Sequence, residues 1–323
     1  HTPPYTPYLC QHNIHITTPR EMPELPEVHT TVTILDKLVS GKKILSVWTD
    51  YNSSFYRGKE NIKDPEYFKK FLEGVSNREI VRVFRRAKNI LLDIEGSSTV
   101  LIHMKMTGHL LYGDYTYLRR SDSWEPTDKQ SSLGGPMSRF VHLVFTLDDG
   151  KFLAFSDMRK FATVKLISDK EALKKEFAPF GPEPLDKDFT AANFEKVLLK
   201  KPNGKIKTVL MDTTVISGIG NIYSDEILWA TNIHPERLVS KISKAEFKDM
   251  HKWTKKLLTK GIDFGGDSMS DYRNPLGLRG EFQNHHNAYQ LKGQGCKKKG
   301  CSGTIIRKVI ATRSAHFCDR HQG

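Results

Sequence analysis

The stretch MPELPEVHTTVTILDKLVSG at residues 22–41 carries the clearest fold signal in the chain. Prolines and acids gather at its start, where the first turn of a helix tolerates proline and favours negative charge. Apolar residues between Val28 and Val39 then recur at helical spacing, and Ser40-Gly41 ends the run. We therefore expect a helix to open a domain here, and residues 1–22 to form a disordered extension.

Downstream of this helix the pattern changes twice. Short β-rich runs occupy residues 43–167, and Asp149-Gly150 is typical of a hairpin turn between two of them. Residues 112–139 are polar and contain Gly, Ser and Pro, which predicts a long loop. Further on, helical periodicity returns, and it predicts helices over 190–201, 205–213, 221–232 and 243–260. The chain is thus expected to be α+β, with a β-rich N-terminal domain followed by a helical domain and a small appendage.

The charge of the chain points to a polyanionic partner. Its 323 residues carry a formal charge of +13, and the pI is near 9.4. Residues 296–323 hold seven Lys or Arg against one Asp, a net charge of +6, so we expect the C-terminus to be a contact surface. No run of 18 apolar residues is present, which excludes a helical membrane span. Few cysteines and no recognisable signal or transit peptide favour a reducing intracellular compartment, with Cys10 a lone thiol in the extension.

Three of the four cysteines form a pattern with a histidine near the C-terminus. Cys296 and Cys301 are separated by four residues, sixteen residues follow, and Cys318 then precedes His321 with two residues between them. Two close pairs of ligands around a hairpin-sized insert are typical of a tetrahedral zinc site, and four protein ligands indicate a structural role. The alternative is three thiols and a histidine placed by chance. So small a module lacks a core of its own, and metal would supply its folding energy.

Pro23-Glu24 has two interpretations. It is a proline-rich helix start and nothing more, or it is a nucleophile with a proton-transferring neighbour. The second holds only if Met22 is the true first residue and is removed. A free α-amine has a pKa near 7.7–8, and the positive end of a helix disfavours its ammonium form. A secondary amine attacks an acetal-like carbon and forms an iminium directly, while Glu24 moves protons for the leaving group. Residues 1–22 would then come from a misassigned start codon or an uncleaved expression tag.

Further motifs decide between these interpretations. In chain order the sequence carries PELPEV (23–28), RRAK (85–88), GPEPL (181–185), GIGNIY (218–223) and the cysteine cluster. This series resembles the Fpg/Nei family of bifunctional DNA glycosylases, and within it the formamidopyrimidine-DNA glycosylase (Fpg/MutM) branch, from Met22 to about Gln322. The resemblance implies an N-terminal β-sandwich flanked by helices, and then a helix–two-turn–helix (H2TH) domain with a β-hairpin zinc finger. It also implies excision of oxidised purines, chiefly 8-oxoguanine and formamidopyrimidines, with strand cleavage by β,δ-elimination.

The same resemblance implies roles for single residues. Pro23 would form the Schiff base at C1′, and Glu24 would donate and accept protons. Lys88 would serve the elimination and hold a phosphate, and Arg313 of the zinc hairpin would bind phosphate and take part in δ-elimination. A base inside a duplex must be flipped out to expose C1′. The residues expected at the DNA are Glu27 near the sugar, the wedge trio Met106, Arg159 and Phe161, and Lys160, Lys205, Lys207 and Asn221 at phosphates.

The resemblance also sets expected boundaries and leaves alternatives. We expect an N-terminal catalytic domain over 23–168, an H2TH domain over 169–281 and a zinc finger over 282–323, in a monomer that works on DNA inside a cell of bacterial type. One departure is DMRKF at 157–161, where the family has DPRRF, so Lys160 replaces an arginine and keeps its charge without the bidentate geometry. Two other functions stay open: a Nei-type enzyme for oxidised pyrimidines, and a non-catalytic damaged-DNA-binding zinc protein in which the retained extension blocks Pro23.

Overall fold

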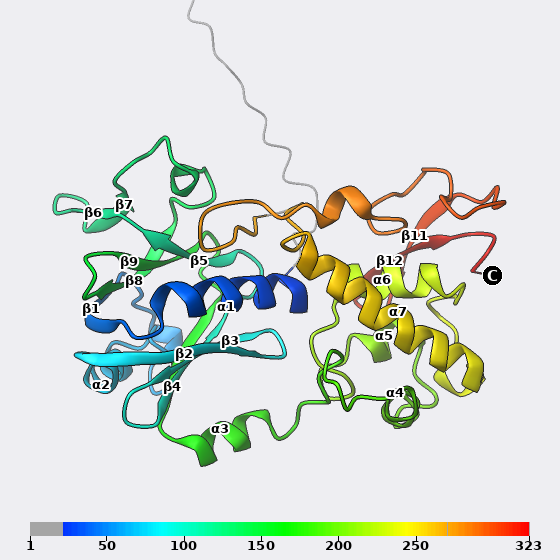
Figure 1. Cartoon of the computed structure of the whole chain (residues 1–323), viewed down its shortest axis with the longest axis horizontal. Helices are drawn as coiled ribbons and strands as arrows, with labels where there is room; N and C mark the ends of the chain where they lie inside the picture. The colour runs from blue at the N-terminus through cyan, green and yellow to red at the C-terminus, as the bar shows by residue number, and fades with distance from the viewer. Residues whose placement is uncertain (1–21, 270, 323) are drawn as a thin grey trace, which may run out of the picture.

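Helix α1 (Leu25–Val39) joins the two halves of the protein (Figure 1). The structure, a computed structural model, describes residues 22–269 and 271–322; the predicted extension 1–22, apart from Met22, and Cys10 lie outside them. Glu24 and Glu27 form a capping box at the start of α1, as the acid-rich first turn suggested. Val28, Val32, Leu35 and Val39 pack into the core of the β domain, whereas Leu25 packs into the core of the helical domain. One helix is therefore anchored in both cores.

The N-terminal half is an antiparallel sheet of eight strands in the order β10-β4-β3-β2-β1-β8-β9-β5. β1 and β2 pair only at Lys43↔Glu79 and Ile44↔Arg78, and both strands have an irregular register just beyond these pairs. The sheet folds at this corner, and side chains from its two halves meet in one core, so the expected β-sandwich is confirmed. The strands are β1 (Lys43–Thr49), β2 (Arg78–Arg86), β3 (Asn89–Ile94), β4 (Ser98–His103), β5 (Gly108–Gly113), β8 (Val141–Leu147), β9 (Phe152–Asp157) and β10 (Thr163–Ile167).

Two parts of this half differ from the sequence-based expectation. Helix α2 (Pro65–Val75) lies within the stretch expected to be all β; its signal was Asp64, which caps the helix by accepting from Glu66 N, followed by proline at the first position. The expected loop at 112–139 contains a hairpin, β6 (Tyr115–Leu118) and β7 (Ser123–Pro126), and a short 3-10 turn, η2 (Ser132–Gly134). The Tyr117 and Trp124 rings pair across this hairpin, which gives its polar sequence an apolar side.

The C-terminal half is helical and ends in a two-stranded hairpin (Figure 1). The four helices expected from periodicity are confirmed, while α3 was missed. A separate core of apolar side chains, including Phe194, Tyr223 and Phe247, holds the helices together. Helix α3 (Lys170–Phe177) comes first and packs on the β-sheet through Leu173 and Phe177, outside this core. The other elements are α4 (Ala191–Leu198), α5 (Ile206–Leu210), α6 (Asn221–Ala230), η3 (Val239–Lys241), α7 (Lys244–Asp263), η4 (Phe282–His285), β11 (Ile305–Ile310) and β12 (Arg313–Cys318). No helix in the described part of the chain is long and apolar enough to cross a membrane.

Lys207 is not at the surface, so the prediction that it contacts phosphate is wrong. Its side chain is 0% exposed, and its Nζ donates to Asp225 Oδ1 at 2.7 Å, to Ser224 Oγ and to Asn221 O. The other carboxylate oxygen of Asp225 accepts from the backbone N–H of His316, on β12. A lysine charge counted from the sequence as basic surface is thus an internal ion pair, which ties α5 and α6 to the hairpin.

Glu183 fixes the two halves against each other. Its carboxylate pairs with Arg85 Nη1 at 2.6 Å and with Arg86 Nη1 at 2.7 Å, and it accepts the backbone N–H of Ala87 at 2.6 Å. Burial raises the pKa of the Glu183 carboxyl, whereas the two arginines and the N–H of Ala87 lower it. The net effect is a lowered pKa. The acid of GPEPL therefore holds the turn between β2 and β3, which presents Lys88.

Candidate active site and metal centre

A cavity of about 440 Å³ opens where the two halves meet. Met22 and Glu24 from the start of α1, Lys88 from the β2–β3 turn, and Asn221 from the start of α6 contribute to its wall. Pro23 lies between the first two of these residues. Of the sequence-predicted site residues, the structure brings five to this wall: Glu24, Lys88, Met106, Asn221 and Arg313.

The Glu24 carboxylate is held by the N-terminus of α6. Oε2 accepts from Gly220 N at 2.6 Å, and Oε1 accepts from Ile222 N at 2.8 Å. Unpaired N–H groups at a helix start attract negative charge, so this site fixes a carboxylate in one orientation. The backbone N–H of Leu25 also donates to Gly218 O at 3.0 Å, which brings the starts of α1 and α6 together.

Gly220 permits a close approach of acid and base. A Cβ at this position would lie 2.4 Å from Glu24 Cδ and 2.7 Å from Lys88 Nζ. The carboxylate and the ammonium group therefore lie against the same face of one glycine. The strained turn that presents Lys88 has Ala87 at φ +54°.

Glu27 lies one helical turn behind Glu24 and is buried. Oε2 accepts from Glu24 N at 2.7 Å, while Oε1 accepts from Asp267 N at 2.7 Å and from the Tyr223 hydroxyl at 3.2 Å. Burial, with the negative charges of Glu24 and Asp267, raises the pKa of Glu27 to about 8. Glu27 is near the helix start as expected, but it supports the site from beneath, and a direct contact with DNA does not fit this position.

The predicted wedge residues lie together. Met106 follows β4, and its Sδ lies 3.1 Å from Arg159 Nη1, whose guanidinium lies 4.5 Å from the centroid of the Phe161 ring. Phe161 is 48% exposed, which is unusual for a large aromatic side chain. Lys160 pairs with Asp50, and Lys205 on the other half pairs with Glu236; both are at the surface.

Sequence reasoning missed His103 and Lys105, which also line the cavity. His103 Nδ1 accepts from the backbone N–H of Lys105 at 3.0 Å. Burial, with the charges of Lys105 and Lys88, lowers the pKa of His103 to about 3, so its imidazole is neutral at pH 7. The available signal was the alternation of His103 and Lys105 with the buried Ile102 and Met104 at the end of a strand.

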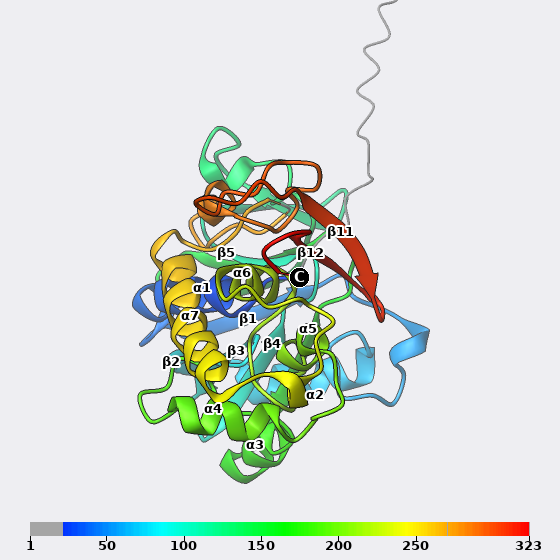
Figure 2. The same ribbon diagram turned by 90° about the vertical axis from the view of Figure 1, so that its right-hand side faces the viewer.

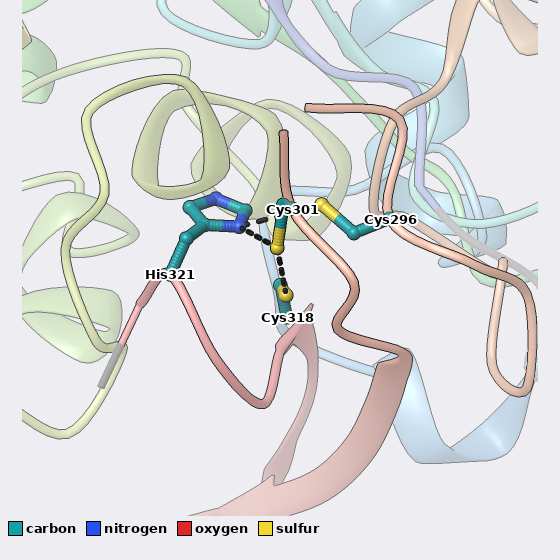
Figure 3. A group of neighbouring side chains, drawn as sticks. All are labelled: Cys296, Cys301, Cys318 and His321. Atoms are coloured by element: carbon teal, nitrogen blue, oxygen red, sulfur yellow. Dashed lines mark hydrogen bonds between the residues drawn. The ribbon is translucent and has the colours of Figure 1, made fainter. Parts of the chain in front are cut away.

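The predicted metal ligands converge beside β12 (Figure 3). The thiol sulfurs of Cys296, Cys301 and Cys318 and Nδ1 of His321 lie within 4.8 Å of one another. His321 turns Nε2 toward the Trp229 carbonyl at 3.2 Å, which leaves Nδ1 as the ligand atom. Three thiolates and an imidazole in this arrangement fit a tetrahedral, closed and therefore structural Zn²⁺ site.

The assigned zinc ligands predict how much metal single-residue variants retain. We expect the full chain to bind about one zinc ion and Cys318→Ser to release it, because three ligands no longer close the site. His321→Cys should retain the metal, because thiolate is an equivalent ligand. Metal content measured by atomic emission, with the affinity for DNA, checks this. Full metal content in Cys318→Ser would contradict the assignment.

Gly220→Ala should remove catalytic activity while the protein remains folded. The new methyl group displaces Glu24 or Lys88, and we expect at least a hundredfold loss in the rate of strand cleavage at an abasic site. Gly295→Ala is the matched control, because a Cβ there meets no atom within 4 Å. Equal cleavage rates for Gly220→Ala and wild type would show that the glycine has no such role.

The raised pKa of Glu27 predicts a pH-dependent stability. Between pH 4.5, its ordinary pKa, and about 8, the unfolded chain has lost this proton and the folded protein keeps it. Stability is therefore fully present below pH 4.5 and falls as pH rises, by about 1.4 kcal/mol for each pH unit. The thermal unfolding midpoint should decrease from pH 5 to pH 8 more steeply in wild type than in Glu27→Gln. Parallel curves would refute the assigned pKa.

A family model described as the formamidopyrimidine-DNA glycosylase N-terminal domain matches residues 22–164, and one described as the H2TH domain of that enzyme matches residues 180–273. The chain is 36% identical over 305 residues to the formamidopyrimidine-DNA glycosylase of Roseiflexus sp., with 93% of this chain and 100% of that protein covered.

Two solved structures extend the likeness to the fold. Fpg of Lactococcus lactis, in complex with DNA containing an abasic site, is 28% identical with a TM-score of 0.76, and MutM in complex with DNA containing carbocyclic 8-oxo-G is 29% identical with a TM-score of 0.75. Each comparison covers 93% of this chain and 99% of the other. With the zinc ligands and the two helix starts in place, the chain belongs to the formamidopyrimidine-DNA glycosylase family of DNA repair enzymes.

Proposed function

We propose that this member of the family excises oxidised purines from duplex DNA and cleaves the resulting abasic site, and that Pro23 is its nucleophile. The observation that carries the proposal is the convergence of Glu24, Lys88, Asn221 and Arg313 on one cavity, whose wall also includes Met22, so that Pro23 lies between two lining residues in the sequence. The chain is a formamidopyrimidine-DNA glycosylase by family, and its solved relatives are bound to DNA with an abasic site or an 8-oxo-G analogue. These substrates fit a site that combines a carboxylate with cations.

In the proposed reaction the Pro23 nitrogen attacks C1′ of the damaged nucleotide. The bond from C1′ to the base breaks, and the base leaves with the bonding electrons and takes a proton from water. The Glu24 carboxylate takes the proton that the Pro23 nitrogen loses and delivers it to O4′ as C1′–O4′ breaks and the sugar ring opens, which leaves an iminium between Pro23 and C1′. Loss of a proton from C2′ expels the 3′ phosphate, and a second elimination expels the 5′ phosphate.

Cations on both halves fit the phosphates of this reaction. Lys88 lies beside Glu24, and Arg313 reaches the same wall from the start of β12. We assign Lys88 to the first elimination and Arg313 to the second, with Asn221 at the phosphate next to the lesion. Met106, Arg159 and Phe161 then fill the space that the flipped nucleotide leaves in the duplex.

The DNA substrate also indicates where the protein works. We propose an intracellular protein associated with DNA, acting as a monomer. The expected domain boundaries at residues 168 and 281 belong to the same proposal.

Covalent trapping tests the nucleophile. A duplex with 8-oxoguanine opposite cytosine is incubated with borohydride and with either the full 323-residue chain or a chain expressed from Met22. Pro23 is an amide while residue 22 stays attached, so only removal of Met22 frees its lone pair. We expect an adduct with the shorter chain alone, lost in Pro23→Gly and Glu24→Gln.

Three other results are informative. Trapping only on a duplex with an oxidised pyrimidine would replace the proposed substrate by that of the Nei-type enzymes. Tight binding without an adduct on any oxidised base would make the protein a damage-binding module. An adduct that persists in Pro23→Gly would be located by peptide mapping, because this variant keeps an α-amine at position 23. An adduct at any other amine would move the nucleophile there.

A further inference from the structure

The loop between β1 and α2, residues 50–63, exposes an aromatic ring that packs in no core. Phe55 is 72% exposed, more than any other large apolar side chain in the described part of the chain. It lies in a short 3-10 turn, η1 (Ser54–Tyr56), and its ring is 5.2 Å from that of Tyr56. Solvent exposure of a phenylalanine gains nothing for folding, so this ring is available to a partner.

Cations cover these rings and connect them to the wedge. Lys59 Nζ lies 3.6 Å from the centroid of Phe55, and Lys63 Nζ lies 4.8 Å from that of Tyr56. Lys63 Nζ also donates to the backbone carbonyl of Lys160 at 2.6 Å. Rings and cations thus form a continuous strip from Phe55 to Phe161, whose own ring carries Arg159.

The acids beside this strip are largely engaged. Asp50 pairs with Lys160 and His142, and Asp64 accepts from the backbone N–H groups of Gly58 and Glu66. Glu60 is exposed. Arg57 and Lys59 are the exposed cations of the loop, whereas Lys63 is only 3% exposed and holds the loop against the backbone of Lys160. The exposed part of the strip is therefore positive.

The strip is on the side of the protein where the hairpin lies. Figure 2 shows the loop, in the mid-blue of residues 50–65, on the same side as the free end of the β11–β12 hairpin. Arg313 starts β12 at that end, and it lines the cavity with Lys88. One partner that reaches the cavity between the two halves is therefore able to lie along the loop as well.

We propose that the β1–α2 loop is an additional DNA contact, which grips the sugar–phosphate backbone of the duplex on one side of the lesion. This proposal rests on the proposed function, which places the wedge residues at the flipped nucleotide. Phe55 lies against the sugars or an exposed base face, and Lys59 moves from the ring to a phosphate. Ring contacts combined with backbone cations are a sequence-independent way to bind nucleic acid.

Binding to a non-cleavable duplex tests this contact. The full chain and its variants are titrated by fluorescence anisotropy with a duplex containing a tetrahydrofuran abasic analogue, at several salt concentrations. Phe55→Ala should raise Kd at least about fivefold. Lys59→Ala should reduce the slope of log K against log salt by about 0.9, the value for one phosphate contact.

Matched controls remove the same groups elsewhere. Val81→Ala removes an exposed apolar side chain from β2, and Lys174→Ala removes one positive charge from α3; both should leave Kd and the slope unchanged. Duplexes shortened on one flank of the lesion or the other locate the contact. Wild type should lose affinity when one particular flank is shortened, and Phe55→Ala should no longer respond to that change.

The outcomes separate the two proposals. If wild type binds the duplex and Phe55→Ala and Lys59→Ala bind equally well with the same slope, the loop proposal is overturned and the proposed function stands. If Phe55→Ala weakens binding equally for both shortened duplexes, the loop acts through the fold and not as a flank contact, which also overturns it. If wild type fails to prefer the abasic duplex over an undamaged one, the proposed function fails first.

Discussion

The contact between the Glu24 carboxylate and the N-terminus of α6 is the interaction on which the site depends. It joins the first turn of α1 to the first turn of a helix nearly two hundred residues later, through hydrogen bonds from Gly220 and Ile222. A carboxylate at this position is oriented by fixed backbone dipoles, and no side-chain rearrangement is needed to stabilise its charge. These bonds form only when the two halves of the protein take one particular position relative to each other, and that position fixes the geometry of the cavity between them.

Other buried contacts hold the two halves in that relative position. Glu183 neutralises Arg85 and Arg86 and accepts the N–H of Ala87, so the turn before Lys88 cannot shift without leaving buried charges unpaired. On the other side of the cavity, Asp225 links Lys207 to the backbone of β12. Neither acid is itself among the residues that line the cavity, and both contact the segments that carry its cations.

Much of this arrangement could be predicted from the sequence, and the failures have physical reasons. The helix at 25–39 and the zinc ligands were predictable because their patterns are local. Lys207 was not, because periodicity places a lysine on a helix but does not show that Asp225 will bury it. His103 and Lys105 were missed for a similar reason: they reach the cavity only through the pairing of β4 within the sheet. The hairpin at 115–126 was hidden by polar residues on its outer side.

The order in which the chain is synthesised determines when the cavity can form. Pro23 and Glu24 precede α1, whereas Arg313 and the ligands Cys318 and His321 are synthesised almost three hundred residues later. Because the cavity wall is drawn from both ends of the chain, it does not exist in a nascent or truncated molecule. The reaction proposed for Pro23 therefore requires that both halves of the protein have folded.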